Sequence, residues 1–319
     1  MNSGHRATLR PRLLPGWGAV RTGRPGGQFR FFCAARKAFR MEFPTFGAAV
    51  RRRMLRLRKA VTGLSIDMKK AILFLSFLAL PLGAVAQDTL RVMTYNVKNA
   101  VGMDGRRNYW RIAGAVARVV PDVVAVQELD SATRRSKGDY VLGELARITK
   151  MHATYAPAID FDGGKYGVGI LSREKPLSVR AVPLPGREEA RVMLMAEFGS
   201  YVFCCVHLSL TDEDRMASLP IILEAVRQWD KPVFLAGDWN ASPSSPFVQE
   251  VQRDFRLLSD TAQTTFPSPA PSETIDYVAA LKPAAGVQVY SSRVPEERVA
   301  SDHRPVVVSL RLEEAEEAR

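Results

Sequence analysis

Hydrophobic residues follow two different patterns after residue 88. Eight short runs predict strands, and several of them are nearly continuously apolar, as strands buried on both faces are. Two other segments repeat apolar residues at helical spacing and predict helices from Trp110 to Val120 and from Met216 to Trp229. The predicted strands cover residues 89–97, 123–129, 166–173, 191–198, 201–208, 232–240, 274–281 and 304–312.

The alternation of these strands and helices predicts a layered α/β or α+β domain. Gly and Pro gather in the connections, as in FDGGKYG and FPSPAPSET, and the chain shows neither internal repeats nor low-complexity tracts. One domain over residues 87–319 therefore accounts for the pattern.

The residues before this domain have the features of an export signal. From Met68 the chain reads MKKAILFLSFLALPLGAVAQDT, which has the basic, apolar and small-residue parts of a signal peptide, so we expect cleavage after Ala86. Its apolar run, residues 71–80, is shorter than the roughly 20 residues of a membrane helix. We therefore expect a secreted or periplasmic protein without a stable membrane span. The alternative is an uncleaved anchor.

Residues 1–67 form a basic extension that precedes the signal. A mis-called start codon, with Met68 as the true first residue, explains it best, because two stacked targeting signals are redundant. A basic targeting arm is the alternative. The extension also distorts the charge: the formal net charge of the chain is +12, but the residues after Ala86 hold 28 Lys and Arg against 31 Asp and Glu. The basicity of the chain thus says nothing about the partner of the domain.

The cysteines give no sign of a disulfide framework. Cys33 lies in the extension, and Cys204 and Cys205 are neighbours in one predicted strand. Adjacent strand residues point to opposite faces, so a bridge between them is strained. We expect the domain to fold without disulfides.

Polar residues of a particular kind stand at the ends of the predicted strands, where sites are commonly built. They are Asn96, Glu128, His207, Asp238, Asn240, Asp276, Asp302 and His303. A hard cation such as Mg²⁺ takes oxygen ligands from one or two carboxylates and keeps its other positions for water and substrate phosphate. Glu128 and Asp302 are suited to hold it, and His207 and His303 are the histidines placed to carry protons. This combination points to phosphate ester hydrolysis.

The segments TYNVKN, PDVVAVQELD, YGVGILSR, VHLSL, LAGDWNASP, TIDYV and SDHRPVV resemble the successive motifs of the endonuclease/exonuclease/phosphatase superfamily, in that family's order. The resemblance spans about residues 89–312. It implies a four-layer sandwich, with two mixed β-sheets packed face to face and helices outside. It also implies a metal-dependent phosphoesterase using Mg²⁺, with Mn²⁺ as an alternative.

The resemblance assigns a role to each motif residue. Glu128 would be the primary metal ligand, supported by Asn96 and Asp302. Asp238 and Asn240 would align the nucleophilic water and the phosphate, Asp276 would orient His303, and His207 would act across the phosphate as a second donor or acid. Arg191 and Tyr166 would contact the substrate.

The substrate class stays open between several phosphate esters. The net charge of the domain disfavours nucleic acid, because proteins that bind its backbone show a basic excess. We therefore expect a small or lipid-linked phosphate as the substrate. We also expect a monomeric enzyme. The alternatives are a secreted endonuclease or exonuclease acting on DNA or RNA, and an inactive binding module that kept the fold.

Overall fold

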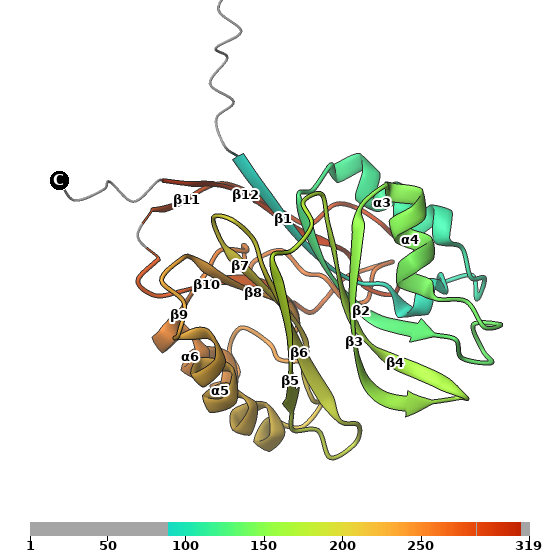
Figure 1. Cartoon of the computed structure of the whole chain (residues 1–319), viewed down its shortest axis with the longest axis horizontal. Coiled ribbons are helices and arrows are strands. Elements are labelled where there is room, and N and C mark those ends of the chain that lie inside the picture. The colour runs from blue at the N-terminus through green and yellow to red at the C-terminus, as the bar shows by residue number, and fades with distance from the viewer. Residues whose placement is uncertain (1–88, 285, 314–319) are drawn as a thin grey trace, which may run out of the picture. The chain divides into compact units, whose positions relative to one another are not determined.

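The computed structural model describes residues 89–284 and 286–313 (Figure 1). The predicted extension (1–67) and signal peptide (68–86) lie outside the described residues. Within the described part, no helix combines the length and the apolar character needed to cross a membrane.

Two six-stranded mixed sheets form the centre of the domain. The first has the strand order β11-β12-β1-β2-β4-β3 and the second β5-β6-β7-β8-β10-β9. The strands are β1 (Thr89–Asn96), β2 (Val123–Ser131), β3 (His152–Phe161), β4 (Gly164–Ser172), β5 (Ser178–Leu184), β6 (Arg191–Glu197), β7 (Val202–His207), β8 (Val233–Asp238), β9 (Phe255–Leu257), β10 (Asp276–Leu281), β11 (Val287–Arg293) and β12 (Val306–Leu312). Because β1 lies between β12 and β2, the first and last strands of the domain are neighbours.

Helices cover the outer face of each sheet (Figure 1). Buried residues of α3 and α4 share a core with the first sheet, and those of α5 and α6 share one with the second. A third core lies between the sheets and contains residues of both. The helices are η1 (Lys98–Ala100), α3 (Tyr109–Val119), α4 (Val141–Thr149), α5 (Asp212–Val226) and α6 (Pro246–Asp254). The predicted four-layer sandwich is thus confirmed.

The two neighbouring cysteines illustrate why the central strands are apolar throughout. Cys204 of β7 packs in the core beneath α5 and α6, whereas Cys205 packs in the core between the sheets. Both are fully buried free thiols. Since side chains alternate across a strand, each face of β7 needs its own apolar set.

The sequence patterns missed seven elements and misplaced helix ends. The missed strands β3, β5, β9 and β11 are the edge strands of the two sheets, and most residues of β3, β5 and β11 are exposed or half-buried. The missed helices are η1, α4 and α6. Helix α5 starts at Asp212 instead of Met216, with three acidic residues in its first turn, where they suit the positive end of the helix dipole. These are corrections to the predicted elements.

Candidate active site

The polar residues predicted at strand ends converge where the two sheets meet. In the second sheet, Asp238 at the end of β8 is the register partner of both His207 on β7 and Asp276 on β10, which places three titratable side chains in one row. From the first sheet, Asn96 at the end of β1 reaches across, and its Nδ2 donates to Asp238 Oδ2 at 3.0 Å. The site is therefore assembled from both sheets.

His303 is held by a buried carboxylate. Its Nδ1 donates to Asp276 Oδ2 at 2.9 Å, so that Nε2 points the other way, 3.6 Å from Asp238 Oδ2. The ring of Phe266 packs against the imidazole with 4.9 Å between ring centroids. Burial opposes the charged imidazolium, but the Asp276 carboxylate outweighs it and, with other nearby carboxylates, raises the pKa of His303 to about 10. A raised pKa favours the protonated form of His303, which can donate from Nε2.

His207 lies on the other side of Asp238 and behaves differently. Its Nε2 is also 3.6 Å from Asp238 Oδ2. Burial is the largest influence and lowers the pKa of His207 to about 4, against the attraction of the Asp238 charge. The two histidines thus flank one carboxylate in opposite protonation states, an arrangement that suits paired acid and base chemistry.

Glu128 sits at an irregularity in β2. Its φ of 59° and a break in the register between Val126 and Leu129 turn its side chain out of the regular pleat. Burial raises the pKa of the Glu128 carboxyl, a hydrogen bond from Asn96 Nδ2 at 2.9 Å lowers it, and the charge of Asp302 raises it again. A half-buried carboxylate beside other carboxylates favours a bound cation.

Asp302 is paired with a lysine that the sequence reasoning did not single out. Lys98 Nζ lies 2.7 Å from Asp302 Oδ2, and the Lys98 backbone N–H donates to Asn96 Oδ1. Lys98, Asn99 and Ala100 all have positive φ, of 45°, 53° and 56°. Consecutive non-glycine residues in this region store strain, which is commonly found at functional sites. The only sequence signal was the position of Lys98, two residues after Asn96.

Asn240 is fixed in the loop that follows β8. Its φ is 50°, its backbone N–H donates to Asp238 Oδ1 at 2.9 Å, and its Nδ2 donates to the Leu208 carbonyl. In β8 itself, Gly237 allows the close approach of β7, because a Cβ there would lie 2.0 Å from the carbonyl oxygen of Val206, its partner on β7. With its amide nitrogen occupied, Asn240 can present its side-chain oxygen to a ligand.

The two predicted substrate contacts are more enclosed than expected. Arg191, at the start of β6, pairs with Glu188 at 3.0 Å and with Glu189 at 3.2 Å, and its buried Nε has no partner within the described residues. Tyr166 of β4 is 9% exposed, and burial followed by the charge of Glu128 raises its pKa. Both line the site, but the amino groups of Arg191 already have carboxylate partners.

The donor set fits a hard divalent cation. Asp238, Asp276 and His303 offer ligand atoms within 4.8 Å of one another, and Asp276 Oδ1 is buried without a hydrogen-bond partner in the described part of the chain. The predicted ligands Glu128 and Asp302 add two further carboxylates, while the Asn96 amide nitrogen bridges Glu128 and Asp238. Oxygen-rich groups of this kind are what Mg²⁺ or Mn²⁺ prefers.

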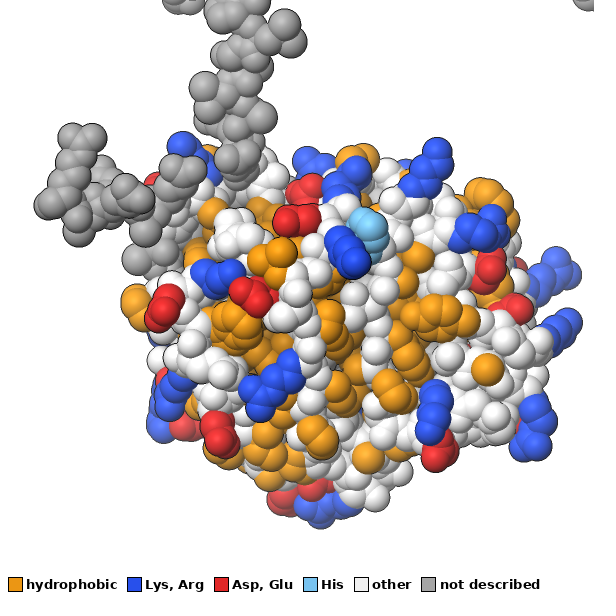
Figure 2. Space-filling view, viewed as in Figure 1, with side chains coloured by type: hydrophobic (Ala, Val, Ile, Leu, Met, Phe, Trp, Pro, Cys, Tyr) orange, Lys and Arg blue, Asp and Glu red, His pale blue; other side chains and the backbone are white. Residues whose placement is uncertain are grey.

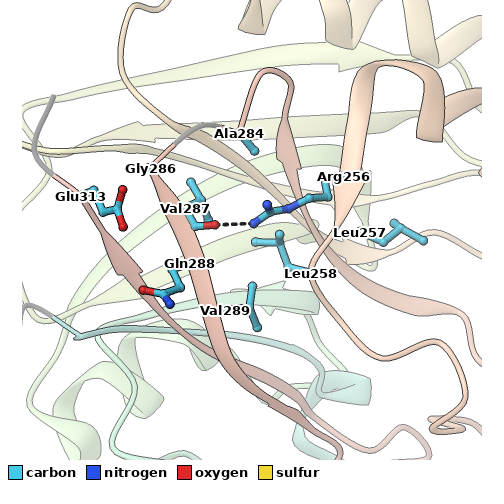
Figure 3. A pocket seen from close by; sticks show the side chains of 9 residues that line it. All are labelled: Arg256, Leu257, Leu258, Ala284, Gly286, Val287, Gln288, Val289 and Glu313. Carbon is cyan, nitrogen blue, oxygen red and sulfur yellow. Dashed lines mark hydrogen bonds between the residues drawn. The ribbon is translucent and has the colours of Figure 1, made fainter.

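A separate cavity of about 610 Å³ opens between β9 and β11 (Figure 3). Arg256 crosses it and donates through Nη2 to the Val287 carbonyl at 2.5 Å. None of the predicted site residues lines this cavity, so it is not the predicted site.

Comparison with known proteins agrees with this geometry. The sequence profile of the Endonuclease/Exonuclease/phosphatase family matches residues 93–303. A search of curated proteins gave no match. Among solved structures, an endonuclease/exonuclease/phosphatase from Beutenbergia cavernae is 25% identical, with a TM-score of 0.55 over 70% of this chain and 72% of that one.

Two further solved structures share the fold at lower identity. A mannosyl-6-phosphatase of Bacteroides thetaiotaomicron is 18% identical, with a TM-score of 0.56 over 69% of this chain and 99% of that one. The human Nocturnin catalytic domain is 17% identical, with a TM-score of 0.55 over 70% of this chain and 95% of that one.

Proposed function

We infer that this chain, which belongs to the endonuclease/exonuclease/phosphatase family, is a hydrolase of phosphate ester bonds. We propose that it is exported, depends on Mg²⁺ and acts on a small or lipid-linked phosphate. The observation that carries the proposal is the convergence of both sheets on Asp238. Asn96 donates to it from the first sheet, His207 and His303 flank it, and Asp276 holds His303.

In the proposed reaction each residue has a task set by its contacts. A bound Mg²⁺ would neutralise charge that develops on the phosphoryl oxygens, and Glu128 with Asp302, supported by Asn96, would hold it. Asp238 accepts the proton of the attacking water, and Asn240 fixes Asp238 through its backbone N–H. Asp276 keeps His303 in one tautomer with Nε2 toward the phosphate.

The remaining residues bind and release the ester. His207 lies across Asp238 from His303 and provides a second polar contact to the phosphate or to the leaving oxygen. Arg191 and Tyr166 border the substrate. The carboxylate partners of Arg191 leave it little net charge to attract a phosphate, so we propose that it mainly orients the substrate.

The distribution of charge supports a small or lipid-linked substrate over nucleic acid. The residues after Ala86 carry an excess of acids. On the face shown in Figure 2, Lys and Arg side chains are scattered among Asp and Glu instead of forming a continuous stripe. A protein that follows a nucleic-acid backbone needs such a stripe.

Export is proposed from the signal-like sequence at 68–86, with Met68 as the true start. N-terminal sequencing of the protein from its native source tests this. A mature N-terminus at Gln87 supports it, and a mature protein that begins before Met68 overturns it.

The proposed activity is tested on the purified protein with aryl phosphate mono- and diesters, sphingomyelin and DNA. We expect hydrolysis of a small or lipid-linked ester that EDTA abolishes and Mg²⁺ restores. Turnover that survives EDTA refutes the metal-dependent mechanism. Cleavage of DNA in preference to every other ester refutes the substrate class and favours a nuclease.

A further inference from the structure

Arg135 is a charged residue at the border of the site to which no role has been assigned. It lies in the loop after β2, and it forms two parallel hydrogen bonds with Asp130, from Nε at 2.8 Å and from Nη2 at 2.7 Å. Asp130 is fully buried and stands two positions after Glu128 on β2. The charge of Glu128 is among those that raise the pKa of Arg135, after the Asp130 hydrogen bond, so Arg135 is anchored near the predicted metal ligand.

The guanidinium is held in place from several sides. Its central carbon lies 4.3 Å from the centroid of the Phe161 ring and 5.5 Å from that of Tyr166. Its backbone N–H donates to Asp162, and its carbonyl accepts from Arg107 Nη1. A paired and stacked arginine loses little conformational entropy when it binds a ligand.

Part of this fixed group remains open to a ligand. The Arg135 side chain is 43% exposed, and its Nη1 makes no hydrogen bond with any residue that the structure describes. Asp130 satisfies one edge of the fork, and the aromatic rings cover one face. The free N–H groups are therefore presented at a defined position for an oxygen of the substrate.

Carboxylates balance the positive charge around this position. Across the site, Glu188 and Glu189 pair with Arg191, and Asp130 pairs with Arg135. The charge of Arg135 is felt at Glu189, where it lowers a pKa that burial and Glu188 raise. These five residues hold two positive and three negative groups, so they offer donors and acceptors without a net attraction for anions. Such a lining suits hydroxyl groups better than a second phosphate.

We propose that Arg135 binds the leaving group of the substrate through hydrogen bonds to its hydroxyl oxygens, and that this leaving group is a sugar or polyol. The inference rests on the proposed phosphoesterase function and narrows its substrate class. Arg135 determines specificity, while the metal ligands and the two histidines act on the phosphate.

The test compares esters with and without a hydroxyl-bearing leaving group. Glucose 6-phosphate and myo-inositol 1-phosphate are compared with p-nitrophenyl phosphate, and glycerophosphoinositol is compared with bis(p-nitrophenyl) phosphate. For Arg135→Gln we expect kcat/KM on the better polyol ester to fall at least about tenfold, mainly through KM, because a hydrogen bond to a charged group contributes about 1.5–3 kcal/mol. On the aryl esters we expect a change below about twofold.

Arg134→Gln is the matched control, because Arg134 is the neighbouring arginine, its side chain is 83% exposed and its partner is Asp162. We expect it to retain the wild-type activity on both kinds of ester. The double variant Asp130→Asn, Arg135→Gln removes both charges, so no buried carboxylate is left unpaired, and it should show the same selective loss at an unchanged melting temperature.

Each other outcome overturns one of the two ideas. If Arg135→Gln and the double variant lower activity on aryl and polyol esters equally, Arg135 acts on the phosphate or on the fold, and the inference fails. It also fails if wild type hydrolyses aryl esters but no polyol ester, although the proposed function then stands. If wild type shows no metal-dependent hydrolysis of any of these esters, the proposed function fails and takes the inference with it.

Discussion

Asp276 offers the sharpest test of how the site works. Its Oδ2 accepts from His303 Nδ1 at 2.9 Å, its side chain is 1% exposed, and its Oδ1 has no hydrogen-bond partner among the described residues. Asp276→Asn keeps the shape and removes the charge. A hydrogen bond to a charged group contributes about 1.5–3 kcal/mol, so we expect kcat to fall about 10- to 150-fold.

The assay measures kcat, KM and the Mg²⁺ concentration for half-maximal rate on an aryl phosphate ester. Asp214→Asn is the control, because Asp214 is another buried carboxylate with several hydrogen bonds, to Arg187 and Thr211, but lies outside the site. We expect the control to lower the melting temperature while the folded protein keeps its kcat. Circular dichroism verifies that Asp276→Asn is folded.

Two results refute the reasoning. A folded Asp276→Asn enzyme with kcat within about twofold of wild type shows that the carboxylate does not orient His303 for the reaction. If kcat recovers at saturating Mg²⁺, the charge of Asp276 serves the cation instead, and the cluster with Asp238 and His303 is a metal site.

Three other predictions address neighbouring groups. Asp302→Asn should raise the Mg²⁺ concentration for half-maximal rate at least about tenfold, with activity restored by excess Mg²⁺, whereas His303→Ala should lose at least about 100-fold in kcat at every Mg²⁺ concentration. Lys98→Met should tighten Mg²⁺ binding in calorimetry about two- to fivefold, because the lysine competes for Asp302 and a partly exposed ion pair contributes up to about 1 kcal/mol; weaker binding contradicts this. Burial opposes the ionised form of Glu188, but hydrogen bonds lower its pKa to about 2. The ionised carboxylate therefore stabilises the folded protein above pH 4.5, and this stabilisation is lost as the pH falls toward 2. Because Glu188 is largely exposed and solvent screens its contacts, Glu188→Gln should reduce the loss of unfolding free energy over that range by up to about 1 kcal/mol in urea titrations. Glu189→Gln should not, because burial raises the pKa of the Glu189 carboxyl.

The central strands were predictable because both of their faces are buried. β7 and β8 are apolar at every position except the last, where His207 and Asp238 stand. Edge strands gave a weaker signal: in β5, Ser178 and Arg180 alternate with residues that are themselves exposed, so the period of two was lost. A strand at the edge of a sheet pairs with one neighbour and is largely exposed, so it does not need alternating apolar residues.

The site was predictable for a related reason, and its limits are physical as well. Asp276 stands inside a predicted strand and His303 just before the last one, so their positions carried information along the chain. Lys98 begins the short helix η1 and Arg135 lies in a loop, and only the folded structure shows that one meets Asp302 and the other Asp130. The break in β2 that turns Glu128 toward the site also left no mark in its apolar pattern.

Because β1 pairs with β12, the site can form only after the chain has been synthesised as far as β12. Asn96 stands at the end of the first strand, and Ser301, beside Asp302 and His303, donates to the Asn96 carbonyl from just before the last strand. A chain still being synthesised therefore has no complete site until Ser301, Asp302, His303 and β12 have been made. Unfinished or prematurely terminated chains should be silent toward the phosphate esters of the cell that makes them.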